Sequence, residues 1–157
     1  KSSALNFINE SQHALSISEM AYSRKDFLLN PIKSHGKWNG INPFKTDSER
    51  INKDSKIGII TRATVNASRM LEFWKSVPDA SNAIKNATGV EWFKGIGEWP
   101  FIQQATFSVW DNLESVKNFA YNSGSHAEII KKTRKRKWYK EDLFARFEIM
   151  DSYYKIF

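Results

Sequence analysis

The sequence predicts an α+β fold of the ferredoxin-like type, with the element order βαββαβ. Between residues 57 and 150 the apolar positions follow the order strand, helix, strand, strand, helix, strand. Clusters of Gly, Pro, Asn, Asp and Ser separate these segments, as turns do. Apolar and polar residues alternate within the strands, which predicts an antiparallel sheet with helices on one face. Of the 157 residues, 41% are hydrophobic, which is enough for one core.

The first part of the chain is predicted to be the end of another, incomplete repeat. Residues 2–20 have helical spacing and no Gly or Pro, so they predict one helix. Residues 27–32 predict a short strand that its proline closes, because proline cannot donate to a strand ladder. Residues 1–33 are therefore interpreted as the remnant of a first ferredoxin-like repeat. Residues 34–55 form a connector, and residues 56–157 form the ferredoxin-like domain.

The first strand and helix of this domain have clear patterns. Residues 56–65 alternate, so Arg62 shares its face with Ile60. Ser68 is expected to cap a helix that either ends near Pro78 or continues beyond it after a kink. The apolar stripe of this helix consists of Met70, Leu71, Trp74 and Val77.

The remaining elements complete the pattern. Two strands are predicted over residues 92–96 and 105–110. Asp111 begins a helix as the first residue of a capping box. Residues 143–150 form the closing strand, which has Arg146 on one face and mainly apolar residues on the other.

Composition excludes several kinds of site. The chain has no Cys, which excludes disulfides, thiolate metal sites and Cys nucleophiles. The aromatic share of 14% is compatible with a pocket for a flat or elongated apolar molecule. Extra aromatic residues in the core are the alternative explanation. No run of about 18 apolar residues and no apolar signal-peptide segment are present, so we expect a cytoplasmic protein.

The net charge of +7 is concentrated in the run Lys131–Lys137. A solvated, basic end of a helix is one explanation of this run. Peripheral contact with an anionic membrane surface is the other. Nucleic acid is not expected as a partner.

His126 is the candidate metal ligand. Ser125 and Glu128 form a second capping box, which opens a helix whose first residue is His126. In a chain without Cys, imidazole is the strongest remaining ligand for a haem iron. A histidine at this position also fits a capping or core role. The spacing of the histidines does not match a zinc or non-haem iron motif.

Arg62 and Arg146 are the candidate cationic groups, since both lie among apolar residues on strands. A buried guanidinium needs a carboxylate or a bound anion as partner. A structural ion pair with Glu98 is one outcome, and a clamp on a haem propionate is the other.

Short phrases in a fixed order resemble the spheroidene monooxygenase family, a family of carotenoid oxygenases, over most of the chain. They are Gly36-Lys37-Trp38-Asn39-Gly40, Thr61-Arg62-Ala63-Thr64, Phe93-Lys94-Gly95-Ile96-Gly97-Glu98-Trp99-Pro100, Gln104-Ala105-Thr106-Phe107-Ser108-Val109-Trp110 and the segment from His126 to Phe147.

The resemblance implies a dimeric α/β barrel that uses haem, oxygen and an external electron donor to oxidise an apolar, carotenoid-like substrate. His126 is the matching histidine and is inferred to ligate the iron. Arg62 and Trp138 are expected to contact the cofactor, and Arg62 and Arg146 to orient a propionate or the bound oxygen. The expected protein partner is a second copy of the chain or the missing N-terminal half.

Two other functions fit the same pattern. One is a haem-binding protein without catalytic activity. The other is a cofactor-free dimeric barrel that binds a small molecule and in which His126 has only a structural role.

Overall fold

The computed structural model describes residues 2–44, 46, 52–99, 101–122, 136 and 138–156. The chain forms two compact units, of which the first comprises Lys1–Asn30 with Ile149–Phe157 and the second Pro31–Glu148. The prediction that residues 1–33 are the remnant of a repeat stays a prediction. Among the described residues, no helix is long and apolar enough to cross a membrane.

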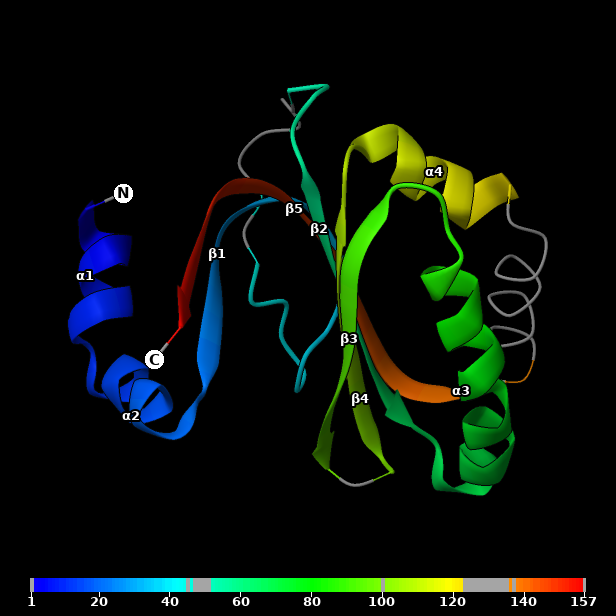
Figure 1. Ribbon diagram of the computed structural model, residues 1–157. Coiled ribbons are helices and arrows are strands. Elements are labelled where there is room, and N and C mark those ends of the chain that lie inside the picture. Colours follow the sequence, from blue (N-terminus) through cyan, green and yellow to red (C-terminus); the bar gives the residue numbers. More distant parts are fainter. Residues whose placement is uncertain are drawn as a thin grey trace. The chain divides into compact units, whose positions relative to one another are not determined.

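The second unit contains the predicted βαββαβ pattern. Its elements are β2 (Ile57–Val65), α3 (Met70–Lys85), β3 (Val90–Trp99), β4 (Gln103–Trp110), α4 (Leu113–Asn122) and the first part of β5 (Tyr139–Ile156). The five-stranded sheet has the order β1-β5-β2-β4-β3, and β2 pairs antiparallel with both β4 and β5. Helices α3 and α4 lie against one face of these strands (Figure 1). The predicted α+β, ferredoxin-like fold is confirmed.

The core lies between these helices and the sheet. Ile57 and Ile59 of β2 are buried together with Trp110 of β4 and Val116 of α4. The indole of Trp110 donates to Ser108 Oγ at 2.9 Å, so its polar atom is satisfied inside the core. We call the side of the sheet that carries Ile57 and Ile59 the helix-side face, and the other side the open face. Side chains alternate between these two faces.

Several boundaries in this unit differ from the predictions. A 3-10 turn at Ala67–Arg69 precedes α3, so Ser68 is not its cap. The helix continues through Pro78 to Lys85, so the longer of the two predicted alternatives is observed, and it ends two residues before the predicted Ala87. At α4 it is Asn112, not Asp111, whose side chain accepts from the backbone of the first turn, Ser115 N at 3.0 Å. Strands β3, β4 and β5 are all longer than predicted, because ladder pairing extends past the strictly alternating residues.

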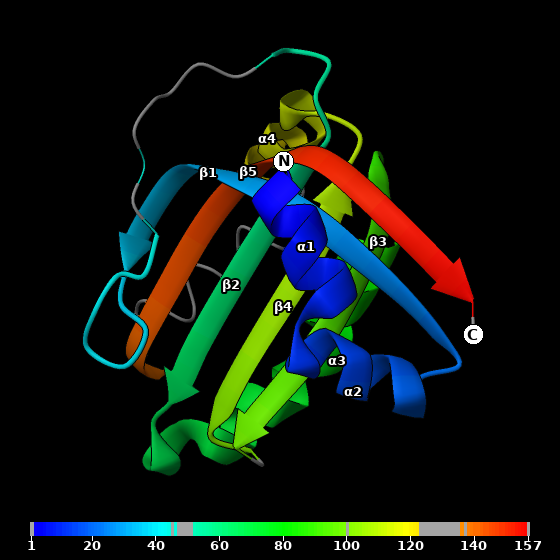
Figure 2. The ribbon, with the colours of Figure 1, turned by 90° about the vertical axis from the view of Figure 1, so that its left-hand side faces the viewer.

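The first unit contains two helices where one was predicted. α1 (Ser2–Glu10) and α2 (Gln12–Met20) are separated at Ser11, whose side chain accepts from Ala14 N at 3.2 Å. This N-cap interaction favours a new helix start over continuation of the first helix. Strand β1 (Ser23–Gly36) is much longer than predicted and continues through Pro31. Since β1 is an edge strand, a proline is tolerated there (Figure 2).

Arg24 joins the elements of the first unit. Its guanidinium donates to the carbonyl oxygens of Ile8 at 2.7 Å and Ala14 at 2.9 Å, and to Ser18 Oγ at 3.2 Å. It also pairs with Asp26 at 2.8 Å, and only 11% of its side chain is exposed. One cation thus satisfies carbonyl groups of both helices and fixes them to β1.

We predict that Arg24→Ala loosens α1 and α2 selectively. Loss of these charge-assisted hydrogen bonds should speed amide exchange in both helices by about 10- to 100-fold. Hydrogen exchange read by mass spectrometry measures this effect, with the exposed Lys33→Ala as control. An equal increase in β2 and β4 would contradict the local role of Arg24.

Candidate functional site

Arg62 is a buried cation on the open face of β2. Its side chain is 0% exposed, and Nη1 lies 2.9 Å from Glu141 Oε1 on β5. The guanidinium carbon lies 5.1 Å from the centre of the Trp38 ring, close enough for a cation–π contact. Strand pairing brings Arg62 and Glu141 together, because Glu141 is paired with Thr64, which lies on the same face as Arg62.

A tight turn before β2 completes this cluster. Trp38 and Ile41 pair across Asn39 and Gly40, whose φ angles of 52° and 84° are those of a type I′ turn. The backbone N–H groups of Asn39 and Gly40 donate to the Glu141 carboxylate at 2.9 and 2.7 Å. Arg62 Nη2 donates to Asn39 Oδ1 at 3.1 Å. Trp38, Asn39, Gly40, Arg62 and Glu141 are called the Arg62 cluster below.

The Glu141 carboxylate is held in its charged form. The hydrogen bond from Gly40 N–H lowers the pKa of Glu141 most, and the bond from Asn39 and the pairing with Arg62 lower it further. Partial burial opposes this shift without reversing it. The ion pair considered for Arg62 therefore exists, but with Glu141 as partner where the sequence suggested Glu98. The side chain of Glu98 lies outside the described part of the structure.

Arg146 lies on the opposite face of the sheet from Arg62. It pairs with Ile59 across β2 and β5, so it belongs to the helix-side face. Its Nε is buried and has no hydrogen-bond partner among the described residues, and its guanidinium lies 5.9 Å from the Phe144 ring. Burial lowers the pKa of Arg146. Arg146 can therefore still donate a hydrogen bond to an anion. The donors of Arg62, in contrast, are largely used by partners within the chain.

Trp138 is buried against α3 and has an indole N–H without a partner among the described residues. Its ring meets Phe73 edge to face at 6.3 Å. Eight residues of extended chain separate Trp138 from Arg146, which corresponds to roughly 25 Å. The two unsatisfied donors therefore do not form a single site. His126 and most of Lys131–Lys137 lie outside the described residues.

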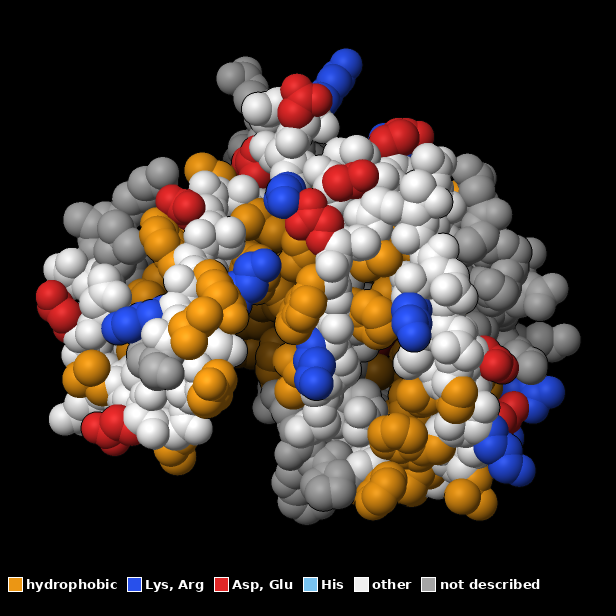
Figure 3. Space-filling model, viewed as in Figure 1, with side chains coloured by type: hydrophobic (Ala, Val, Ile, Leu, Met, Phe, Trp, Pro, Cys, Tyr) orange, Lys and Arg blue, Asp and Glu red, His pale blue; other side chains and the backbone are white. Residues whose placement is uncertain are grey.

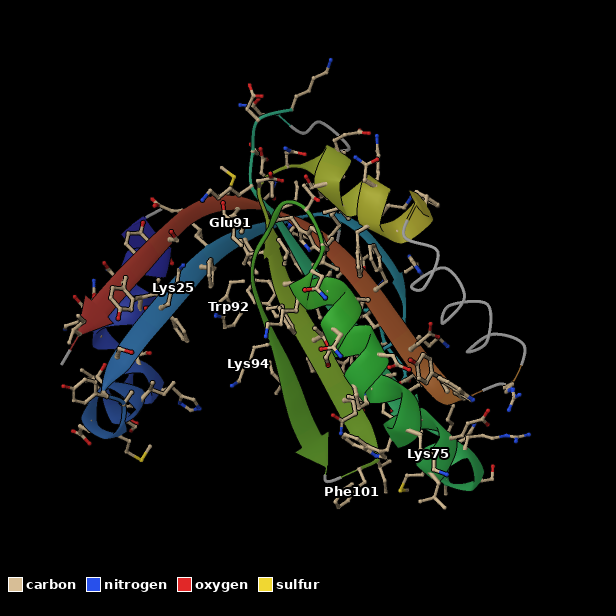
Figure 4. All side chains as sticks on the ribbon, turned by 45° about the vertical axis from the view of Figure 1, so that its right-hand side comes forward. Lys25, Lys75, Glu91, Trp92, Lys94 and Phe101 are labelled. Atoms are coloured by element: carbon tan, nitrogen blue, oxygen red, sulfur yellow. The ribbon has the colours of Figure 1, made fainter. Side chains whose placement is uncertain are left out.

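The open face carries an apolar strip that the sequence analysis did not identify. Trp92 and Ile96 of β3 are 42% and 49% exposed, and Trp92 contacts Phe107 of β4 at 6.0 Å. Figure 4 shows Trp92 and Lys94 pointing away from α3. Trp92, Lys94 and Ile96 are spaced two residues apart along the strand, and this spacing could have predicted that they share one face. Among the described residues, no group of three or more His, Asp or Glu side chains could hold a metal ion.

Comparison with known proteins shows which proteins this chain resembles. Over 134 residues the chain is 38% identical to a spheroidene monooxygenase of Cereibacter sphaeroides, a match that covers 85% of this chain and 41% of that protein. A spheroidene monooxygenase of Rhodobacter capsulatus is 31% identical over 78% of this chain and 51% of its own length. The chain matches the spheroidene monooxygenase family. It spans about half the length of these relatives or less. No protein-family model matches the sequence.

Solved structures support the fold. A Fusobacterium nucleatum protein that is provisionally named a monooxygenase superposes with a TM-score of 0.59 at 13% identity. The match covers 99% of this chain and 68% of that protein. At this identity the similarity establishes a shared fold and nothing finer.

We predict that the Arg62 cluster makes stability pH-dependent through Glu141. The pKa of Glu141 is lowered from 4.5 on folding, so its contribution is present above pH 4.5 and is lost as the pH falls through the lowered value. Thermal unfolding midpoints measured from pH 7 to pH 3 should therefore fall less steeply in Glu141→Gln than in wild type. Glu114→Gln, an exposed carboxylate on α4, is the control. Equal slopes for Glu141→Gln and wild type would contradict the assignment.

Proposed function

We propose that this chain is the haem-binding part of a monooxygenase that oxidises an apolar, carotenoid-like substrate. The observation that supports this most is the 38% identity to a spheroidene monooxygenase over 134 residues. Because the chain spans 41% of that relative, the complete activity is proposed only for an assembly in which a second copy or a further domain joins it. The strip around Trp92 and Ile96 is the surface on which such a partner would pack.

The proposed reaction inserts one oxygen atom of O₂ into a C–H bond of the substrate. The other oxygen atom leaves as water, with two electrons from an external donor and two protons. Haem, when bound, would supply the oxygen chemistry, and His126 would hold its iron.

Of the two candidate arginines, Arg146 would be the better partner for a haem carboxylate. The unsatisfied Nε of Arg146 is suited to a carboxylate such as a propionate, since a charge-assisted hydrogen bond would satisfy a buried donor. Phe144, beside Arg146, adds an apolar contact on the same face. Arg62 is already compensated by Glu141, so we assign it a positioning role for the turn that carries Trp38.

We predict that hemin binds and that binding depends on His126 and Arg146. His126→Ala should abolish the Soret shift on hemin titration, because the side chain proposed to hold the iron is lost. Arg146→Met should weaken hemin binding by about tenfold, the value of one charge-assisted hydrogen bond. His13→Ala and Lys117→Met, both at exposed positions, are the matched controls. Equal titrations for all variants would favour the cofactor-free barrel.

Activity provides the second half of this test. The hemin-loaded protein is given a carotenoid polyene, a chemical reductant and ¹⁸O₂, and the product mass is measured. One labelled oxygen atom per product molecule is expected. Hemin binding without any labelled product, even with a full-length relative's N-terminal part added, would favour a non-catalytic haem-binding protein.

A further inference from the structure

A cluster of exposed apolar side chains lies where α3 begins beside the turn between β3 and β4. Leu71 and Phe101 are 81% and 60% exposed. The Trp74 ring meets Phe101 edge to face at 5.7 Å. Figure 3 shows hydrophobic side chains gathered at this end of the second unit, and Figure 4 places Phe101 at the end of the β3–β4 turn with Lys75 nearby. Leu71, Trp74 and Phe101 are called the apolar tip.

The backbone conformation of Phe101 and one hydrogen bond define the turn that carries the apolar tip. Phe101 has φ 70°, a left-handed conformation that a bulky non-glycine residue rarely adopts. Trp74 Nε1 donates to the Phe101 carbonyl oxygen at 3.2 Å, which braces the turn against α3. An aromatic ring is thus kept in solvent by a strained backbone, although a glycine would fit the same turn without strain.

Charged side chains of both signs lie next to Leu71 and Trp74 on α3. Lys75, Arg69 and Arg136 are exposed, whereas the nearby carboxylate Glu72 is already contacted by both arginines. Asp79 follows one helical turn after Lys75. The described charges next to the tip are thus three cations and two carboxylates, which leaves a small positive excess. Aromatic anchors with cations beside them match the chemistry of an anionic bilayer surface, where rings lie at headgroup depth and cations meet lipid phosphates.

We propose that the apolar tip docks on an anionic lipid bilayer. The small positive excess beside the tip favours an anionic occupant. The inference deepens the proposed function, because an apolar polyene would be taken from a bilayer. It assigns the contact to the apolar tip and the cations beside it, one of which, Arg136, belongs to the run Lys131–Lys137 considered in the sequence.

Vesicle binding tests the proposal without substrate or cofactor. Wild type should cosediment with vesicles of phosphatidylglycerol and phosphatidylcholine and bind less to phosphatidylcholine alone. Phe101→Gly and Leu71→Gln should each lower the partition coefficient by about tenfold, because an anchor is lost. Lys75→Gln should lower it roughly fivefold on the anionic vesicles only.

Two controls separate docking from damage to the fold. Phe101→Gly relieves the strained φ, so its thermal midpoint should equal or exceed that of wild type. Ile41 is an apolar residue that is 66% exposed and remote from the tip in sequence. Ile41→Gln should therefore bind vesicles as wild type does.

Three outcomes would overturn the proposal. They are absence of wild-type binding to anionic vesicles, equal binding by wild type and Phe101→Gly, and self-association in sedimentation velocity that Phe101→Gly abolishes. The last outcome would assign the tip to an interface between copies. The vesicle assay contains neither haem nor polyene, so it does not depend on the proposed function. Failure of the protein to oxygenate a polyene would therefore count against the proposed function and would not affect the proposed membrane contact.

Discussion

The buried charge of Arg62 is the constraint on which the open face depends. A fully buried guanidinium is tolerated only when a carboxylate and further hydrogen bonds compensate it. Glu141 supplies the charge, and the Asn39–Gly40 turn fixes that carboxylate through two backbone N–H groups. Three segments distant in sequence must therefore meet at one point. A shift of one residue between β2 and β5 would place Glu141 on the other face, so the ion pair also specifies the register.

The same alternation separates the two arginines that the sequence placed in one site. Arg62 and Arg146 lie on opposite faces of the sheet, and each meets a different chemical environment. Arg62 is compensated within the chain, whereas the Nε of Arg146 has no partner among the described residues. A bound anion on the helix-side face can use Arg146 and cannot use Arg62 without crossing the sheet. The proposed positioning role of Arg62 and the proposed binding role of Arg146 rest on this difference in face.

Local periodicity was sufficient to predict the order of strands and helices in the second unit, because burial of one face imposes it. Periodicity did not predict the helix boundaries that a single capping side chain determines. Ser11 ends one helix by capping the next, and Asn112 takes the capping role expected of Asp111. The partner of Arg62 was not predictable either. Many carboxylates lie on strands or turns, and only the pairing of β2 with β5 selects Glu141.

Asn39 and Phe101 show how differently two left-handed residues are supported. Both have positive φ. Asn tolerates this conformation, and its side chain accepts a hydrogen bond from buried Arg62, so the turn is stabilised from within the fold. Phe101 has a larger steric cost, and its ring is 60% exposed. Core packing therefore does not offset that cost, and Trp74 contributes only an edge contact and one hydrogen bond. Burial of this ring on the proposed anionic bilayer would offset the steric cost.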